Sequence, residues 1–190
     1  MIAFDLDGVI ADTYLDIRSE ILRRFGHDIQ PGQNQHAIHV PGTSEEAVSK
    51  AVRDSLLSLN APPHIWTPEA LHQIHQLTSA PIMIATARAC GKEDLVLKAY
   101  TLAWCKRHIP APFALYFRSS REKKDLLIDL GIRYWVDDRL MAANHIAPFV
   151  QRVFLVNRQW NLGRDTMPNV ERVDDLRPVA EFIRREASGV

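Results

Sequence analysis

Two pairs of aspartates stand at the ends of short apolar segments. Asp5 and Asp7 belong to the segment FDLDG, and Asp137 and Asp138 end the segment YWVDD. Carboxylates held close together raise each other's pKa unless a cation relieves the repulsion or the two groups divide the work. The first pair therefore indicates a metal site, a proton-transfer site, or both. Adjacent acids at the end of a buried segment also require cations nearby, because burying unpaired charge is costly.

Each candidate residue also has a purely structural interpretation. Asp7 is followed by glycine, a pair typical of turns, and Asp5 can be a strand-end residue bonded to backbone. Thr86 ends the apolar segment PIMIAT and can cap the turn after it. Lys123 and Lys124 precede a predicted helix, where such charged runs commonly lie on the solvated surface. For each residue taken alone, both interpretations stay open.

The elements that would position these residues are five short, almost continuously apolar segments. Such segments, with helical patterns between them, predict a parallel sheet covered by helices on both faces, which is an α/β fold. Because ligands bind outside the carboxyl ends of parallel strands, we expect the acids, the threonine and a lysine to meet at one edge. The predicted strands are residues 2–6, 81–86, 113–117, 134–136 and 153–156.

A long insertion separates the first two predicted strands. Its patterns predict a helix over residues 13–25, capped by Asp12 and stopped by Gly26, and a second helix that starts after Ser44 and runs to about residue 59. Further helices are predicted over residues 68–77, starting with Pro68, and near the end of the chain over residues 178–186. We therefore expect a core of residues 1–12 and 67–190 with a small helical cap of residues 13–66.

Composition sets the broad class of the protein. The chain has 190 residues, of which 46% are hydrophobic and 24% charged, as is typical of a folded globular protein. Lysines and arginines number 23, as do aspartates and glutamates, so net charge gives no reason to expect nucleic-acid binding. Two cysteines and no long apolar run favour a cytoplasmic protein without a membrane span. The sequence predicts no particular oligomeric state.

The order of these motifs along the chain resembles that of a known enzyme family. Asp-x-Asp-Gly after the first strand, Thr after the second, Lys before a helix and Asp-Asp after a later strand are similar to the haloacid dehalogenase superfamily of aspartate-nucleophile phosphotransferases. The resemblance covers the whole chain, with residues 13–66 in the place of that family's cap. It implies a Rossmann-like core.

The resemblance also implies roles for individual residues. Asp5 would be the nucleophile that forms an aspartyl phosphate, and Asp7 the general acid and base. Thr86 would bind the transferred phosphoryl group, and Lys123 would hold nucleophile and phosphate. The acid at Asp7 favours phosphoryl chemistry, because the true dehalogenases that resemble this chain lack an acid at that position.

A magnesium site is implied in the same way. Asp137 and Asp138 would complete it together with Asp5 and the backbone carbonyl of Asp7. Hard oxygen ligands of this kind suit Mg²⁺, and the set contains no histidine or cysteine. The resemblance leaves open which acid of the second pair binds the metal directly.

Within this superfamily, parts of the sequence resemble the cytosolic 5′(3′)-deoxyribonucleotidases and their bacterial relatives. The similar parts are DLDGVIAD, the short helical cap and the run SREKKD. In those enzymes an Arg-acid-Lys run carries the catalytic lysine, which favours Lys123 over Lys124. The resemblance implies a 5′-nucleotidase that acts on nucleoside 5′-monophosphates.

A nucleotide substrate also needs flat side chains that hold the base. Candidates within the insertion are Tyr14, His36, His39 and Trp66. In the stretch after Thr86 the chain departs from the nucleotidases, because Ala87 and Arg88 replace a small hydroxyl residue and a proline. Arg88 can reach a phosphate or a base edge, or it can cap the strand. A phosphatase for a sugar phosphate or another small metabolite shares every catalytic residue, and a catalytically idle binding module is a third alternative.

Overall fold

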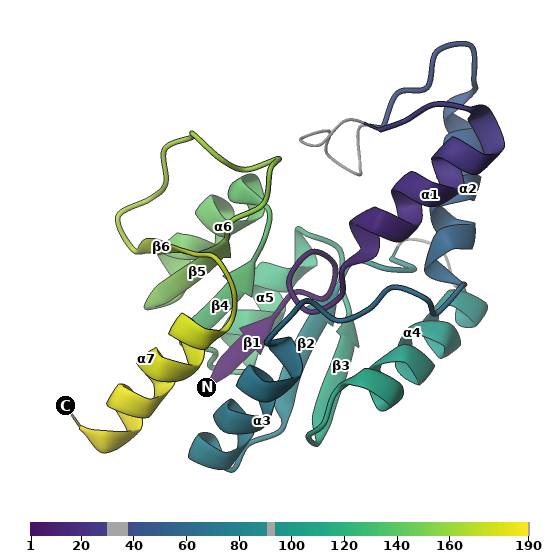
Figure 1. The fold of residues 1–190 in the computed structure, drawn as a ribbon. Helices are drawn as coiled ribbons and strands as arrows, with labels where there is room; N and C mark the ends of the chain where they lie inside the picture. The colour runs from purple at the N-terminus through teal and green to yellow at the C-terminus, as the bar shows by residue number, and fades with distance from the viewer. Residues whose placement is uncertain (30–37, 91–93, 190) are drawn as a thin grey trace.

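The computed structural model describes residues 1–29, 38–90 and 94–189. Its centre is a six-stranded sheet in which every neighbouring pair is parallel, in the order β3-β2-β1-β4-β5-β6 (Figure 1). The α/β fold with a parallel sheet is therefore confirmed. The strands are β1 (Ile2–Phe4), β2 (Ile82–Thr86), β3 (Phe113–Phe117), β4 (Tyr134–Asp137), β5 (Arg152–Val156) and β6 (Val170–Val173).

Helices cover both faces of this sheet. Because side chains alternate along a strand, Phe4 and Val136 face one layer, which also contains apolar residues of α3 (Thr67–Thr78), α4 (Leu95–His108) and α7 (Arg177–Ser188). Ala3 and Trp135 face the opposite layer, with residues of α5 (Glu122–Asp129) and α6 (Leu140–Ile146). A short 3₁₀ helix (Ala147–Phe149) follows α6. No helix in the described part of the chain is long and apolar enough to cross a bilayer.

Two helices project beyond the carboxyl end of the sheet, as Figure 1 shows. They are α1 (Thr13–Phe25) and α2 (Glu45–Leu56), and they share an apolar cluster of their own that includes Ile17, Ile21 and Ala51. The segments that lead into and out of this pair run side by side: the Asp12 N–H donates to the Pro62 carbonyl at 2.8 Å, and the His64 N–H to the Ile10 carbonyl at 2.9 Å. The division into a core and a cap of residues 13–66 stays a prediction.

The ends of these helices follow the predicted signals in part. Gly26 has φ 65° at the end of α1, and the Ser44 hydroxyl accepts the Ala47 N–H at 3.3 Å at the start of α2. Asp12 stands at the N-cap position of α1, but its side chain makes no capping hydrogen bond. The predicted end of the second helix is wrong, because α2 stops at Leu56 and Leu59 adopts a left-handed backbone with φ 56°.

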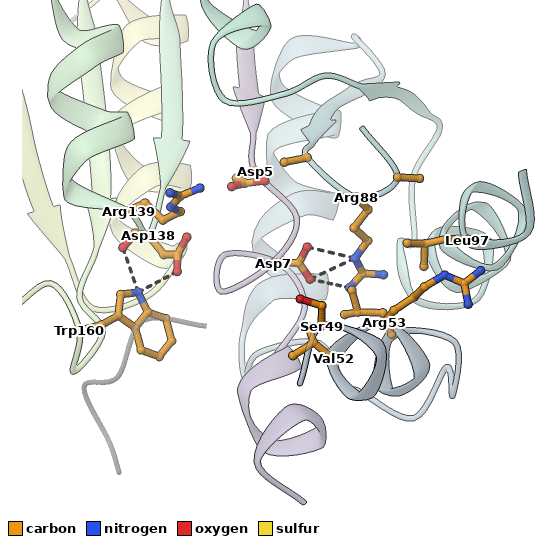
Figure 2. Close-up of a pocket in the computed structure, with 13 residues that line it drawn as sticks. Asp5, Asp7, Ser49, Val52, Arg53, Arg88, Leu97, Asp138, Arg139 and Trp160 are labelled. Atoms are coloured by element: carbon orange, nitrogen blue, oxygen red, sulfur yellow. Dashed lines mark hydrogen bonds and ion pairs between the residues drawn. The ribbon is translucent and has the colours of Figure 1, made fainter. Parts of the chain in front are cut away.

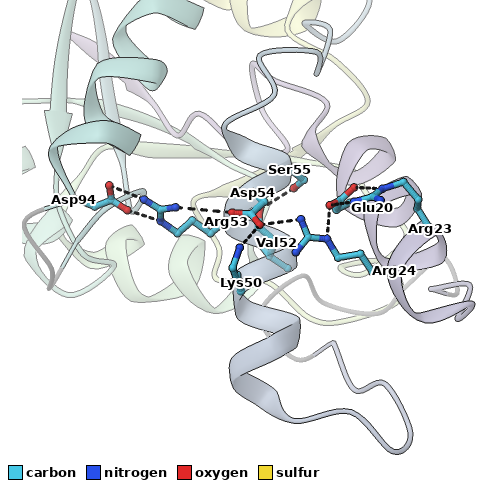
Figure 3. A network of polar contacts seen from close by, with 9 residues as sticks. All are labelled: Glu20, Arg23, Arg24, Lys50, Val52, Arg53, Asp54, Ser55 and Asp94. Carbon is cyan, nitrogen blue, oxygen red and sulfur yellow. Dashed lines mark hydrogen bonds and ion pairs between the residues drawn. The ribbon is translucent and has the colours of Figure 1, made fainter.

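A network of charged side chains joins the two projecting helices to each other and to the core (Figure 3). Arg24 of α1 contacts Asp54 of α2 at 2.8 Å. Arg53 of α2 forms two hydrogen bonds, of 2.6 and 3.0 Å, with Asp94, which caps the first turn of α4. The Arg53 pair therefore connects the second projecting helix to a helix that packs on the sheet.

Candidate active site

The first aspartate pair does not lie on a continuing strand. β1 ends at Phe4, and the Ile10 and Ala11 N–H groups both donate to the Leu6 carbonyl, which turns the chain back on itself. Asp5 and Asp7 therefore lie beyond the end of the strand, and its pleat does not decide where their side chains point. In Figure 2 the Asp5 carboxylate faces Asp138, whereas that of Asp7 faces Arg88, although both acids line the same cavity.

Three buried carboxylates meet at the carboxyl edge of the sheet. Asp5, Asp137 and Asp138 each offer an oxygen, and these atoms all lie within 4.8 Å of one another. Burial first, and then the charge of Asp5, raises the pKa of Asp137 to about 6. Burial and the charge of Asp137 raise the pKa of Asp138 well above its ordinary value. The carboxylates of the cluster therefore repel one another, and a bound cation would reduce this repulsion.

The donor set fits a divalent metal ion. It consists of hard carboxylate oxygens, as Mg²⁺ prefers, and the buried Oδ1 of Asp138 has no hydrogen-bond partner. A buried, unpaired carboxylate oxygen is costly unless a ligand satisfies it. The residues that would hold such an ion are Asp5, Asp137 and Asp138. Asp7 was predicted to add its backbone carbonyl. The carboxylate of Asp7 instead contacts Arg88.

Glycine at position 8 allows the loop after β1 to approach these acids. Gly8 has φ +75°, and a Cβ atom placed on it would lie 2.2 Å from Oδ2 of Asp138. The Gly8 carbonyl accepts a hydrogen bond of 2.8 Å from Nε of Arg158. Both the backbone conformation and the close contact therefore require glycine here.

Lys123 supplies the cation that the sequence predicted near the acids. Its side chain is only 2% exposed, and Nζ lies 2.9 Å from Oδ1 of Asp5. Burial opposes the charged amine, but the charges of Asp5 and Asp137 raise the pKa of Lys123 above its ordinary value. Lys124 instead contacts Asp125 at 3.4 Å and is about one-third exposed. The structure therefore brings Lys123, and not Lys124, to the acids.

Asp7 is paired with a buried arginine. Nε of Arg88 lies 3.1 and 3.0 Å from the two carboxylate oxygens of Asp7, and Nη2 lies 2.5 Å from Oδ1. Burial raises the pKa of Asp7, but the charge and hydrogen bonds of Arg88 outweigh it, so that the pKa lies below its ordinary value. Arg88 was predicted to reach a phosphate or a base edge; in the structure it holds Asp7.

Thr86 has the contact expected of a turn-capping residue. Its side chain is fully buried, and its hydroxyl oxygen accepts the Arg88 N–H at 3.2 Å. Its neighbour Ala87 lines the cavity that holds Asp5 and Asp7, whereas Thr86 is not among the residues that line it. The phosphoryl-binding role of Thr86 stays a prediction.

The cavity above Asp5 and Asp7 has a volume of about 220 Å³. One wall comes from α2 and from Leu97 of α4, and the opposite wall from Trp160, as Figure 2 shows. Away from the acids the lining combines apolar side chains with Ser49 and three arginines. The full set is Asp5, Asp7, Ser49, Val52, Arg53, Leu56, Ala87, Arg88, Ala89, Leu97, Asp138, Arg139 and Trp160.

The predicted base-binding residues lie elsewhere. Tyr14 packs against Trp160 with ring centroids 5.7 Å apart, and its hydroxyl donates to the Ile29 carbonyl. The guanidinium carbon of Arg177 lies over the ring of Trp66, 4.8 Å from the ring centroid. Neither Tyr14 nor Trp66 lines the cavity at Asp5, and neither does His39; His36 lies outside the described residues.

Sequence reasoning missed several residues of the cavity, among them Trp160 and Arg53. Trp160 follows β5 by four positions, and its indole Nε1–H donates to the carboxylate and to the carbonyl of Asp138 at 2.9 and 3.2 Å. The segment NRQWN directly after the predicted fifth strand was the signal available for it, because ligands bind at strand carboxyl ends. Arg53 had no such signal, since it lies in a helix of the insertion.

The fold is similar to that of solved hydrolase structures. A haloacid dehalogenase-like hydrolase from Xanthomonas campestris matches with a TM-score of 0.60 and 13% identity, over 100% of this chain and 97% of that one. A haloacid dehalogenase-like family protein from Streptococcus pneumoniae matches with a TM-score of 0.59 and 13% identity, over 95% and 97%. CbbY from Rhodobacter sphaeroides, solved with phosphate, matches with a TM-score of 0.55 and 12% identity, over 92% and 93%.

The sequence comparisons add no relative to these structures. No protein-family model matches the chain, and no curated protein does. At 12 to 13% identity the structural matches speak for the fold alone. The chain thus has the fold of the haloacid dehalogenase-like hydrolases, with an aspartate cluster, a buried lysine and a cavity at the carboxyl edge of its sheet.

Proposed function

We propose that this protein is a phosphomonoester hydrolase in which the Asp5 carboxylate attacks the phosphorus atom. The observation that carries the proposal is the position of Asp5, which lines the cavity, contacts Lys123 at 2.9 Å and shares a cluster with Asp137 and Asp138. A carboxylate nucleophile divides one displacement into two easier ones through a covalent intermediate. Three acids and a buried lysine at the carboxyl edge of the sheet suit that chemistry. Residues that only formed a turn or a solvated surface would not need to come together in this way.

In the first step an Asp5 oxygen forms a bond to phosphorus while the bond to the ester oxygen breaks. Lys123 stabilises the phosphoryl oxygens and holds the attacking carboxylate in place. A divalent ion bound by Asp5, Asp137 and Asp138 would supply further positive charge for the phosphoryl oxygens. Among divalent ions, Mg²⁺ fits these carboxylate ligands best. Thr86 is the proposed further contact of the phosphoryl group.

In the second step water attacks the phosphorus of the aspartyl phosphate and releases Asp5. Asp7 is the group that accepts the proton of this water, and its pairing with Arg88 favours the ionised form that a base requires. In the first step Asp7 would donate a proton to the leaving oxygen, which requires that it be protonated at that point. Arg88 therefore has to yield part of its contact when the substrate is bound.

The cavity favours a small phosphorylated metabolite as the substrate. Its volume of about 220 Å³ is below the roughly 300 to 1,000 Å³ that ligand pockets commonly have. A mutant of the CbbY protein, which shares the fold, has been solved with xylulose-1,5-bisphosphate. A nucleoside 5′-monophosphate is the second candidate, because the indole ring of Trp160 and the apolar side chains of α2 offer surfaces for a base.

A panel of phosphate esters tests the proposal. We expect Mg²⁺-dependent release of phosphate, and a loss of turnover by several orders of magnitude in Asp5→Asn, because the amide cannot attack phosphorus. Rates for sugar phosphates and nucleoside monophosphates under one condition rank the two substrate classes. Turnover that survives in Asp5→Asn would refute the nucleophile. Absence of turnover with every ester would favour a binding module without catalysis.

A further inference from the structure

Asp138 divides its two carboxylate oxygens between different environments. Oδ2 accepts a hydrogen bond of 2.9 Å from Nε1 of Trp160, whereas Oδ1 is buried and has no hydrogen-bond partner. Figure 2 shows the indole approaching Asp138 from the opposite side of the cavity from Arg88. One oxygen is therefore fixed by the protein, and the other is left for a ligand.

Trp160 is itself held firmly. Its Nε1–H also lies 3.2 Å from the Asp138 carbonyl, and its ring packs against Tyr14 of α1. The next residue, Asn161, donates from Nδ2 to the carbonyls of Asp138 and Val156 at 2.7 and 2.8 Å. The loop after β5 thus wraps around Asp138 and gives the indole little freedom to turn.

The neighbouring acid has a different arrangement. Oδ2 of Asp137 accepts the Nε1–H of Trp135 at 2.9 Å, and Oδ1 accepts the Arg139 N–H at 2.8 Å. Because both oxygens of Asp137 have a donor, rotation of its carboxylate is restricted from two sides. The carboxylate of Asp138 accepts a hydrogen bond from Trp160 alone among the described residues, so the orientation of this carboxylate depends on one hydrogen bond.

We propose that Trp160 is a positioning residue for the metal site: its indole N–H fixes the carboxylate of Asp138 so that Oδ1 faces the cation. The inference rests on the proposed function, since it concerns the metal site of that enzyme. Groups that orient a metal ligand commonly change metal affinity by 10- to 100-fold when they are removed. Trp160 also lines the substrate cavity, so it connects the cavity wall to the metal ligands.

The test measures Mg²⁺ binding by calorimetry on the protein without substrate. In Trp160→Phe a smaller aromatic ring replaces the indole and the N–H donor is lost, and we expect binding 10- to 100-fold weaker than in the wild type. Trp104→Phe is the matched control, because the buried Trp104 donates its Nε1–H to the backbone carbonyl of Ala61 at 2.8 Å and not to an acid. Its Mg²⁺ affinity is expected to equal that of the wild type.

A second measurement does not depend on the folding of the variant. In a Mg²⁺ titration of the wild-type protein followed by NMR, the assigned indole N–H signal of Trp160 is expected to shift, whereas that of Trp104 is expected to stay in place. Equal Mg²⁺ affinity of Trp160→Phe and wild type, or an unmoved Trp160 signal during binding, overturns the positioning role and leaves the proposed function standing. A wild-type protein that binds no Mg²⁺ overturns the metal site and this inference together.

Discussion

Lys123 and Lys124 are neighbours in the sequence but lie in opposite environments. Lys123 is buried against Asp5, and Lys124 lies at the surface beside Asp125. We expect Lys123→Met, which keeps an apolar stem, to lower kcat/KM by on the order of 100-fold or more, because the phosphoryl oxygens lose their amine. Lys124→Met is the matched control and should stay within about twofold of the wild type. Steady-state kinetics on one phosphate ester checks both variants.

Equal effects of the two substitutions would contradict this assignment. Thermal unfolding of both variants separates a catalytic loss from a folding defect, since Lys123→Met also leaves the buried Asp5 without its ion pair. A kinetic loss in Lys123→Met that exceeds its loss of folded protein supports a direct role at the phosphate.

At this scale the sequence predicted which residues meet, but not all of their contacts. The acids were predictable because each follows an apolar strand, and parallel strands bring their carboxyl ends together. The pairing of Arg88 with Asp7 joins positions 81 residues apart, and no spacing rule predicts such a contact. The same holds for the hydrogen bond from Trp160 to Asp138, which depends on the path of a loop after β5.

At the scale of elements, five strands were predictable because their sequences are almost uniformly apolar. β6 was missed because its sequence, VERV, places Glu171 and Arg172 between two buried valines at the edge of the sheet. An edge strand does not require uniform apolarity, although β3 at the opposite edge has it. β1 was predicted two residues too long, because Leu6 is fully buried in the turn that follows the strand.

The ion pair between Arg53 and Asp94 is the element-scale contact with a testable consequence. It joins α2 to the first turn of α4 (Figure 3), and Arg53 also lines the cavity (Figure 2). In Arg53→Gln we expect faster hydrogen exchange of α2 amides and a higher KM, because that wall of the cavity is held less tightly. Hydrogen exchange with mass spectrometry, together with steady-state kinetics, measures both.

Lys50→Gln provides the matched control on the same helix. Lys50 pairs with Asp54 one turn away within α2, at 2.6 Å, so its loss removes an ion pair of that helix but no contact with α4. Exchange of the α2 amides should therefore rise less than in Arg53→Gln, and the KM should stay as in the wild type. If Arg53→Gln and Lys50→Gln have the same effect on both readouts, the pair with Asp94 does not hold the cavity wall.

At the scale of the whole molecule, the two projecting helices and the sheet have separate apolar clusters. They are joined by two antiparallel segments that meet at Ala11 and Pro63. The sequence predicted an insertion here from the long interval between the first two strands. It did not predict that the two connecting segments pair with each other, because main-chain pairing between two short segments leaves no periodic signal.

His64 lies in one of these connecting segments and makes the stability of the whole molecule depend on pH. Its Nε2 is buried without a hydrogen-bond partner, and burial first, then the charge of Arg158, lowers its pKa from 6.5 to about 3. Asp12 is the acid that faces it, with Oδ2 3.7 Å from Nδ1, a distance too long to offset the burial. The folded protein therefore keeps His64 neutral in a range where the unfolded chain binds a proton.

The sign of the effect follows from this difference in proton binding. Well above pH 6.5 His64 is neutral in both states and does not change the free energy of unfolding. Between pH 6.5 and about 3 only the unfolded chain takes up the proton, and the free energy of unfolding falls. At pH 5 this loss amounts to about 2 kcal/mol relative to pH 7.5, from 1.36 kcal/mol for each pH unit below 6.5.

Urea unfolding of the wild type and of His64→Gln at pH 7.5 and 5 measures this loss. The variant should lose about 2 kcal/mol less than the wild type over this interval, because glutamine does not titrate, while His72→Gln, a change at an exposed side chain, should lose as much as the wild type. An equal loss in His64→Gln and the wild type would mean that the unfolded and the folded chain protonate His64 alike, and that the connecting segment is open to water in solution.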